Sequence, residues 1–173
     1  MTRIPYPDPQ TRSEPQRAVL TSGKPVLNIS RMAMHLKDPL WSGYRNFAIV
    51  ARDAAPLDDG LREMVILRVG YLSNSAYELH HHLPVAVQAG VPDAKLKAVE
   101  SGDFTALDPR ERAVLDYASQ VVTQVGADDA TLKALQDWFS TEDIFGITIL
   151  VCGYMTTARL IALGGVEAEE GHG

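Results

Sequence analysis

The sequence predicts an all-α protein, a bundle of about six to eight helices that forms an oligomer. Apolar residues recur at helical spacing along most of the chain from Asn28 onward. Alternating runs and Asn-Gly hairpin turns, which are typical of strands, are nearly absent. With 173 residues the chain is long enough to bury one core. We therefore expect a single domain.

The first segment, residues 1–27, is rich in Pro, Arg, Gln and Ser. This composition predicts an extended arm with little regular structure, lying over its own domain or over a neighbouring subunit. The all-α domain is expected over 28–165, and a polar tail over 166–173. Helical patterns in the domain run from Asn28 to the stop at Asp38-Pro39, from Trp41 to before Pro56, from a cap at Asp58 or Asp59 to Leu72, from a cap at Asn74-Ser75 to Gly90, and over about 93–100, 109–125, 128–139 and 142–163.

Several helix ends carry local signals. Asp58 or Asp59 can cap the helix that contains Leu61 to Leu72, and Asn74-Ser75 can cap the next one. Gly90 ends that helix, with Pro92 beyond it. Asp108-Pro109 is a start signal, because proline suits the first helical turn. These ends separate the periodic stretches into distinct helices.

The last helix, from Ile144 to Leu163, is apolar nearly all round. Glycines, threonines and Arg159 interrupt it, so we interpret it as a buried helix and not as a membrane span. A helix without a polar face needs packing partners on every side. Because one small domain does not easily supply them, we expect a homo-oligomer.

Bulk properties exclude several classes of function. A formal net charge of -6, a pI near 5.3 and the lack of a Lys/Arg cluster argue against a nucleic-acid partner. The single cysteine, Cys152, excludes an intramolecular disulfide and a CxxC redox pair. No basic-then-apolar leader begins the sequence, so we expect a cytoplasmic protein with no membrane partner.

Four polar residues fall on two consecutive helices and form the main candidate site. Ser75, Glu78 and His82 share one face of their helix, which is otherwise apolar, and Glu63 lies among apolar residues on the preceding helix. Buried charges must be paired or used. The pattern alone favours a structural Glu–His tie over a proton-transfer site, and whether Glu63 reaches His82 depends on how the helices cross.

The residues around this site resemble those of the carboxymuconolactone decarboxylase family, whose superfamily also contains the AhpD-type alkylhydroperoxidases. The resemblance rests on Leu61–Val69, on the twelve-residue step from Glu63 to Ser75, and on His82–Val91. It extends over about residues 40–165 and is clearest over 61–91. It implies an AhpD-like helical fold and trimers or hexamers, with dimers also possible.

The peroxidase branch carries Glu followed by Cys-x-x-Cys-x-x-x-His. In this chain the two cysteine positions hold Ser75 and Glu78, and His82 matches the histidine. Peroxide reduction needs a thiolate and a resolving thiol, so the resemblance argues against a thiol peroxidase. Glu78 and His82 instead match the Glu-x-x-x-His of the decarboxylase branch.

The resemblance thus implies a cofactor-independent lyase that decarboxylates a carboxylated lactone, similar to 4-carboxymuconolactone, or a related small oxo acid of aromatic catabolism. We expect Glu63, Glu78 and His82 to be catalytic and Ser75 to bind substrate. His82 is the expected proton donor, because imidazole titrates near neutral pH, and Glu78 can hold its orientation. Glu63 can act as a further acid or base.

Other interpretations stay open at this point. A metal- or acid/base-dependent isomerase or hydrolase fits the same residues, since Glu63, Glu78 and His82 could share an ion. A non-catalytic binding module is the third possibility. We expect no cofactor and no resident metal. The substrate is expected to be a small carboxylate, and its cationic partner comes from Arg45, Arg62, Arg68 or Arg159 without a preference among them.

Overall fold

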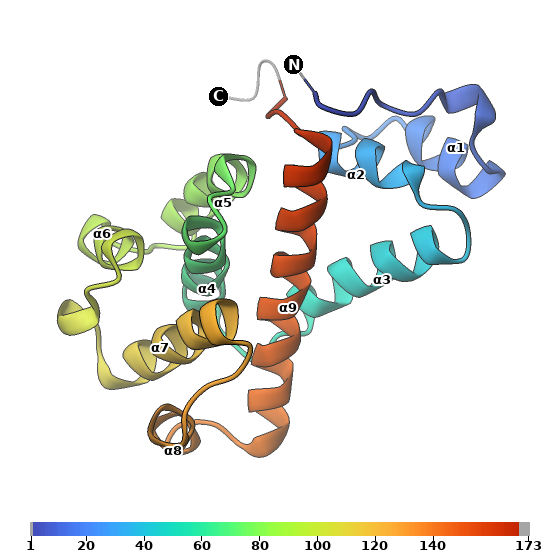
Figure 1. Ribbon diagram of the computed structural model, residues 1–173. Coiled ribbons are helices and arrows are strands. Elements are labelled where there is room, and N and C mark those ends of the chain that lie inside the picture. Colours follow the sequence, from blue (N-terminus) through green and yellow to red (C-terminus); the bar gives the residue numbers. More distant parts are fainter. Residues whose placement is uncertain (1, 170–173) are drawn as a thin grey trace.

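The computed structural model describes residues 2–169, and this part of the chain is entirely helical apart from turns and loops (Figure 1). Its α-helices are α1 (Glu14–Leu20), α2 (Asn28–Met32), α3 (Leu40–Asp53), α4 (Asp59–Leu72), α5 (Ala76–Gln88), α6 (Asp93–Ser101), α7 (Pro109–Gln124), α8 (Asp129–Gln136) and α9 (Thr141–Gly164). Short 3-10 turns occur at Pro9–Thr11, Ala33–His35 and Phe104–Ala106. The all-α prediction is confirmed. The described part holds nine helices because α1 adds one to the eight periodic stretches.

Helix α4 is the centre of the main core. It packs against α5, α6, α7 and α9. Six of the seven residues from Leu61 to Leu67 are buried. Asp58 begins the helix by accepting a hydrogen bond from the Leu61 amide at 3.0 Å. A helix enclosed by neighbours on nearly every side can place a polar side chain deep in the protein, and α4 does so with Glu63.

Helices α4 and α5 form an antiparallel hairpin with a very short connection. Gly70 lies where the two helices meet, and a Cβ atom added there would stand 3.1 Å from Leu79 Cδ2. The close approach therefore favours a residue without a side chain, because Leu79 would have to shift to make room for a larger one. This packing brings the inner face of α5 next to α4.

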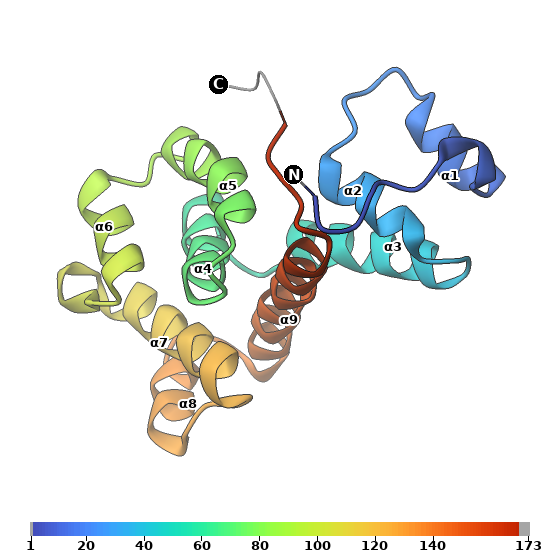
Figure 2. The ribbon, with the colours of Figure 1, turned by 45° about the horizontal axis from the view of Figure 1, so that its top comes forward.

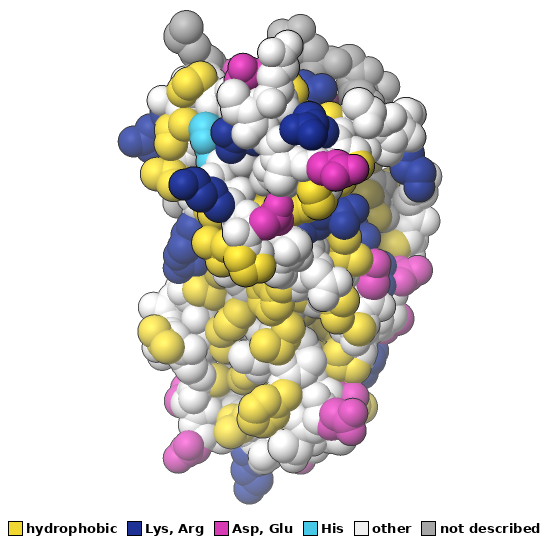
Figure 3. Space-filling view, turned by 90° about the vertical axis from the view of Figure 1, so that its right-hand side faces the viewer, with side chains coloured by type: hydrophobic (Ala, Val, Ile, Leu, Met, Phe, Trp, Pro, Cys, Tyr) yellow, Lys and Arg dark blue, Asp and Glu magenta, His cyan; other side chains and the backbone are white. Residues whose placement is uncertain are grey.

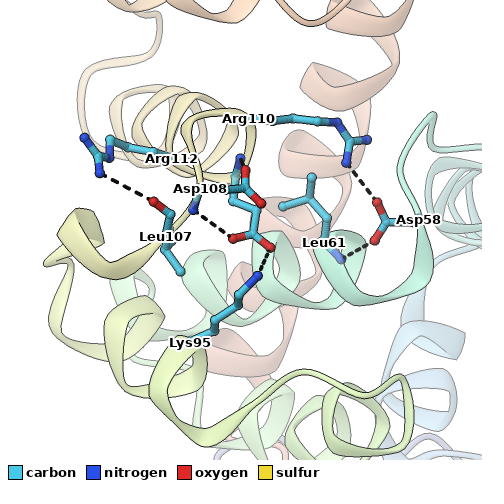
Figure 4. Close-up of polar contacts among 8 residues, drawn as sticks. Asp58, Leu61, Lys95, Leu107, Asp108, Arg110 and Arg112 are labelled. Atoms are coloured by element: carbon cyan, nitrogen blue, oxygen red, sulfur yellow. Dashed lines mark hydrogen bonds and ion pairs between the residues drawn. The ribbon is translucent and has the colours of Figure 1, made fainter.

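Polar ties fix α6 and α7 to the beginning of α4 (Figure 4). Arg110 at the start of α7 donates to Asp58 at 3.0 Å, so the cap of α4 is also joined to α7. Asp108 and Glu111 form the capping box of α7, and Lys95 of α6 pairs with Glu111. These ties hold the beginning of α4 in place against α7, and α7 against α6.

Helix α9 crosses the middle of the molecule and packs against α2, α3, α4, α7 and α8 (Figures 1 and 2). Ile147, Leu150 and Val151 are fully enclosed, whereas Phe145 and Ile149 are exposed. In the described part of the chain, α9 alone is long and apolar enough to span a membrane by length and composition. Its contacts here are those of a core helix with one uncovered edge.

The arm differs from the expected extended form, since it contains α1. Ser13 and Gln16 form a capping box that starts this helix, a local signal that the proline-rich composition masked. Gln16 is buried and donates to the carbonyl oxygens of Met34 and Leu36. The arm therefore lies over its own domain beside α2 and α3 (Figure 2).

The described part of the tail returns to the same region. Glu169 accepts a hydrogen bond from the Tyr77 hydroxyl at 2.8 Å and contacts His81 Nε2 at 2.7 Å. Arg3 and Ile4 donate backbone hydrogen bonds to Gly164 O. Both ends of the described chain thus meet near the end of α9, and positions 170–173 of the expected tail lie outside the described residues.

Candidate active site

A buried Glu–His pair joins α4 to α5. His82 Nδ1 lies 2.7 Å from Glu63 Oε2, and Glu63 is only 2% exposed. A carboxylate accepts hydrogen bonds, so Nδ1 carries the hydrogen and Nε2 is the nitrogen left for another partner. The pair fixes the orientation of the imidazole ring.

Two further groups surround this pair. Arg62 Nε lies 3.6 Å from Glu63 Oε1, while the other end of the guanidinium contacts Asp59 at 2.9 Å. The ring of Tyr154, on α9, meets the His82 ring edge-on with 5.1 Å between centroids. His82 is therefore held by α4 on one side and by an aromatic side chain of α9 on the other.

Glu78, one helical turn before His82, is in a different environment. It is 3% exposed, and neither carboxyl oxygen has a hydrogen-bonding partner among the described residues. Burial raises the pKa of Glu78 to about 7, and the nearby Ser75 hydroxyl acts in the opposite direction. Near neutral pH a large share of this side chain therefore carries its proton and can act as an acid.

Ser75 occupies the N-cap position of α5 without capping it through its side chain. The spacing Ser-x-x-Glu is typical of a capping box, yet here the Ser75 hydroxyl and the Glu78 carboxyl are both buried and without hydrogen bonds to described atoms. The two positions that hold thiols in the peroxidase pattern thus hold two buried polar groups.

Glu78 and His82 line a cavity of about 400 Å³. This volume lies within the range of sites that bind small molecules. Its walls come from α2, α3, α5, α9 and the arm, and most of them are apolar, with Ile29, Met34 and Trp41 among the lining residues. Tyr44 and Thr157, which are 3.1 Å apart between hydroxyl oxygens, add polar groups to the wall.

The structure brings together three of the four residues that the sequence singled out. Glu78 and His82 reach the cavity, and Glu63 supports His82 from behind without lining it. Ser75 is buried next to Glu78 and is not a lining residue. The role of orienting the imidazole, expected for Glu78, belongs to Glu63. Side chains one turn apart on a helix project side by side, whereas Glu63 meets the ring from the facing helix.

Most of the arginines expected to bind a substrate carboxylate do not reach the cavity. Arg68 is bound to Ser119 Oγ at 2.8 Å and to Val99 O at 3.0 Å, and Arg159 donates to Met155 O in its own helix. Of the four candidates, Arg45 alone lines the cavity, and Arg52, which the sequence argument missed, lines it as well. Arg45 and Arg52 are two turns apart on α3, a spacing that would have been the available signal.

Aromatic residues of the site were also missed as functional residues. Trp41 and Tyr44 come from α3 and Tyr154 from α9, far from Glu78 in sequence. Burial and the neighbouring Glu63 raise the pKa of Tyr154, which keeps its hydroxyl protonated. Sequence pattern alone marks such residues as ordinary core positions.

A three-ligand metal site is not assembled in the described part of the chain. Within residues 2–169 no group of three His, Cys, Asp or Glu side chains is placed to hold an ion. His81 turns toward Tyr77, with 4.5 Å between ring centroids, and His80 is exposed. Three consecutive histidines on this helix thus serve three different environments.

Comparison with known proteins finds a family model that matches the part of the chain carrying this site. Residues 41–120, which include α4, α5 and the whole polar constellation, match the model of the carboxymuconolactone decarboxylase family. The match confirms the resemblance seen in the sequence, although it ends well before residue 165. Among curated proteins, no sequence matches this chain.

Solved structures share the fold over nearly the whole chain. An uncharacterised peroxidase-related protein from Ralstonia eutropha JMP134, described as an alkylhydroperoxidase AhpD core, has a TM-score of 0.77 at 19% identity and covers 98% of this chain and 93% of its own. A peroxidase-related protein from Silicibacter sp. TM1040 has a TM-score of 0.75 at 19% identity, covering 96% and 87%. The debrominase Bmp8, in complex with 2,3,4-tribromopyrrole, has a TM-score of 0.71 at 17% identity, covering 98% and 93%. At these identities the likeness establishes the AhpD-like fold.

Proposed function

We propose that this chain, whose residues 41–120 match the model of the carboxymuconolactone decarboxylase family, is a cofactor-independent acid/base lyase. The proposed substrate is a carboxylated lactone such as 4-carboxymuconolactone, or a related small oxo acid. One observation carries the proposal. A buried carboxyl group with a pKa of about 7 and no hydrogen-bonding partner among the described residues lines the same cavity as an oriented histidine.

Decarboxylation of such a substrate needs an acid. The bond to the carboxylate breaks, its electron pair moves into the conjugated carbonyl as CO2 leaves, and the carbon then takes a proton. Glu78 is suited to give that proton, because its pKa lies close to neutral pH and the surrounding wall is apolar. In this proposal His82, expected to be the donor from sequence, has a different part.

His82 supplies the base. With Nδ1 donating to Glu63, its Nε2 is available to a ligand or to a proton that must be returned to Glu78. Glu63 holds the ring and stabilises the imidazolium when the ring takes up a proton. The cavity therefore contains an acid and a base one helical turn apart.

The same acid and base favour one alternative, an isomerase that moves a proton between two carbons of an oxo acid. His82 would remove the proton and Glu78 would supply one at the second carbon. No CO2 is released in that reaction. The two activities are thus separated by their products.

Turnover of 4-carboxymuconolactone by the wild-type protein, followed as CO2 release, tests the proposal. Glu78→Gln keeps the shape of the side chain and removes the acid, so we expect CO2 release to fall by about 10²–10⁴-fold. His80→Gln, at an exposed position of the same helix, is the control and should keep wild-type activity. If no CO2 appears and solvent deuterium enters the substrate in a Glu78-dependent way, the isomerase replaces the lyase.

We also propose that the chain forms a homo-oligomer through the face that contains the uncovered edge of α9. Phe145 and Ile149 lie one turn apart on this edge, and Ile49 and Val50 are exposed on the adjacent α3. Seen from the α3 side, apolar side chains gather across the middle and lower part of this face (Figure 3). Apolar surface of this kind is typical of a protein interface.

A further inference from the structure

The cavity has two chemically different ends. At its inner end lie Glu78, which is 3% exposed, and His82 with its buried partner Glu63. Three exposed cations also line the cavity, Lys24 of the arm and Arg45 and Arg52 of α3. The wall between the two ends is largely apolar.

Arg45 is an unpaired cation at this opening. Within residues 2–169 no carboxylate forms an ion pair with it, and its guanidinium has no hydrogen bond to the protein. Arg52, the other lining arginine of α3, already contacts Asp53 at 2.7 Å, and the charge of Glu63 also acts on it. Of the two arginines, Arg45 is therefore the one left to receive an anion from outside.

The spacing of the two arginines sets a length. Seven residues of helix separate them, a rise of about 10 Å along α3. Asp53 raises the pKa of Arg52 most, and the charges of Tyr154 and Glu63 raise it further, so Arg52 lies on the side of the cavity that faces the His82 site. A ligand that reaches from His82 to Arg45 must cross on the order of 10 Å. A single lactone ring is shorter than that, so a lactone or oxo acid that also contacts Arg45 carries an apolar extension.

The apolar wall defines what lies between. Trp41 of α3 contributes an aromatic side chain to the wall, and Ile29 and Met34 contribute aliphatic ones. A ligand with an apolar body buries surface against these side chains, which favours binding. A small dicarboxylate leaves them in contact with water.

We propose that the site takes an amphipathic oxo acid, whose carboxylate is bound by Arg45 at the opening and whose apolar body lies against Trp41. The carbonyl group then stands near Glu78 and His82. Arg45 is thus a specificity-determining residue, and the proposal refines the substrate of the acid/base function proposed above, on which it rests. The carboxylate bound by Arg45 stays on the molecule throughout the reaction, and the group that leaves as CO2 is a second carboxylate, next to the carbonyl group near Glu78 and His82.

Binding of phenylbutanoate to the full chain tests this proposal without any turnover. Trp138→Phe leaves Trp41 as the single tryptophan, so quenching of its fluorescence reports on the cavity. The neutral isostere phenylbutanamide and the small dianion succinate are the comparison ligands. We expect phenylbutanoate to bind about 10-fold more tightly than either, because a charge-assisted hydrogen bond and apolar burial then act together.

Variants in this background locate the anion site. Arg45→Met keeps the aliphatic stem and removes the charge. It should weaken the binding of phenylbutanoate about 10-fold and leave the binding of phenylbutanamide unchanged. Arg159→Met, at an exposed position outside the cavity, is the control and should behave as the parent. Added salt should weaken the binding of phenylbutanoate and not that of phenylbutanamide, because salt screens only the charged interaction.

Three outcomes overturn the proposal: equal binding of acid and amide, equal binding of succinate and phenylbutanoate, or a loss caused by Arg52→Met and not by Arg45→Met. The failure of the proposed reaction is separate. If lactone turnover is absent but the Arg45-dependent binding is found, the anion site stands by itself. If lactone is turned over and phenylbutanoate does not bind, the anion site alone is refuted.

Discussion

The buried carboxyl group of Glu78 makes the stability of the protein depend on pH, and Glu78→Gln tests this directly. Burial raises the pKa of Glu78 from 4.5 to about 7, since the ionised form is removed from water, and the nearby Ser75 hydroxyl offsets only part of this effect. Glutamine has nearly the same shape and never ionises. The variant should therefore lose the pH dependence and keep the fold.

The sign and size follow from the two pKa values. Below pH 4.5 Glu78 is protonated in both the folded and the unfolded chain, so it does not lower the free energy of unfolding. Between pH 4.5 and about 7 the unfolded chain binds fewer protons than the folded one, so the free energy of unfolding falls as the pH rises. Above this window the loss is complete. A shift of about 2.5 pKa units at 1.36 kcal/mol per unit corresponds to a loss on the order of 3 kcal/mol.

Urea unfolding from pH 4.5 to 8, at one fixed protein concentration, measures this difference. The free energy of unfolding of Glu78→Gln relative to wild type should rise by about 3 kcal/mol across the range. Glu100→Gln removes a carboxylate at an exposed position of α6 and serves as the matched control, whose curve should run parallel to wild type. A parallel curve for Glu78→Gln would refute the argument that burial holds the proton on this group.

Two further predictions concern stability and assembly. His82→Ala leaves Glu63 buried without its partner and should lower the free energy of unfolding by roughly 3–5 kcal/mol. His82→Asn keeps a donor near the position of Nδ1 and should lower the free energy of unfolding much less, so equal losses in the two variants would contradict the pairing. Phe145 on α9 is 70% exposed, and Phe145→Asp places a charge at this position of the proposed interface, so it should lower the molar mass measured by light scattering. Val87→Asp, at an exposed position of α5, is the control and should leave the mass unchanged. An unchanged mass for Phe145→Asp would exclude this face as the interface of the proposed oligomer.

The helices were largely predictable because their signals are local. Asp58 and Asp108 both cap the helices that they were expected to begin, and the periodic stretches fall within a few residues of the observed helices. One local signal was met only in part. Ser75 occupies the N-cap position of α5, as expected, but its side chain is buried and makes no capping hydrogen bond.

The site was only partly predictable for a related reason. Glu78 and His82 are one turn apart, so their common face follows from helix geometry alone. Arg45 and Trp41 join them through α3, whose packing no spacing within α5 encodes. Arg68 looked like a candidate in the sequence, and its hydrogen bonds to Ser119 and to backbone carbonyls place it in a structural role.

The sequence by itself determined the helical class, the resemblance to a family, and which chemical groups occupy the two thiol positions, because each of these depends on residue identity and short-range spacing. The tertiary structure alone decided that Glu63 orients His82, that burial raises the pKa of Glu78, and that α3 and the arm close a cavity around them. These properties depend on how helices cross and on what they exclude from water. Crossing geometry and burial come from the packing of distant segments, which no local pattern encodes.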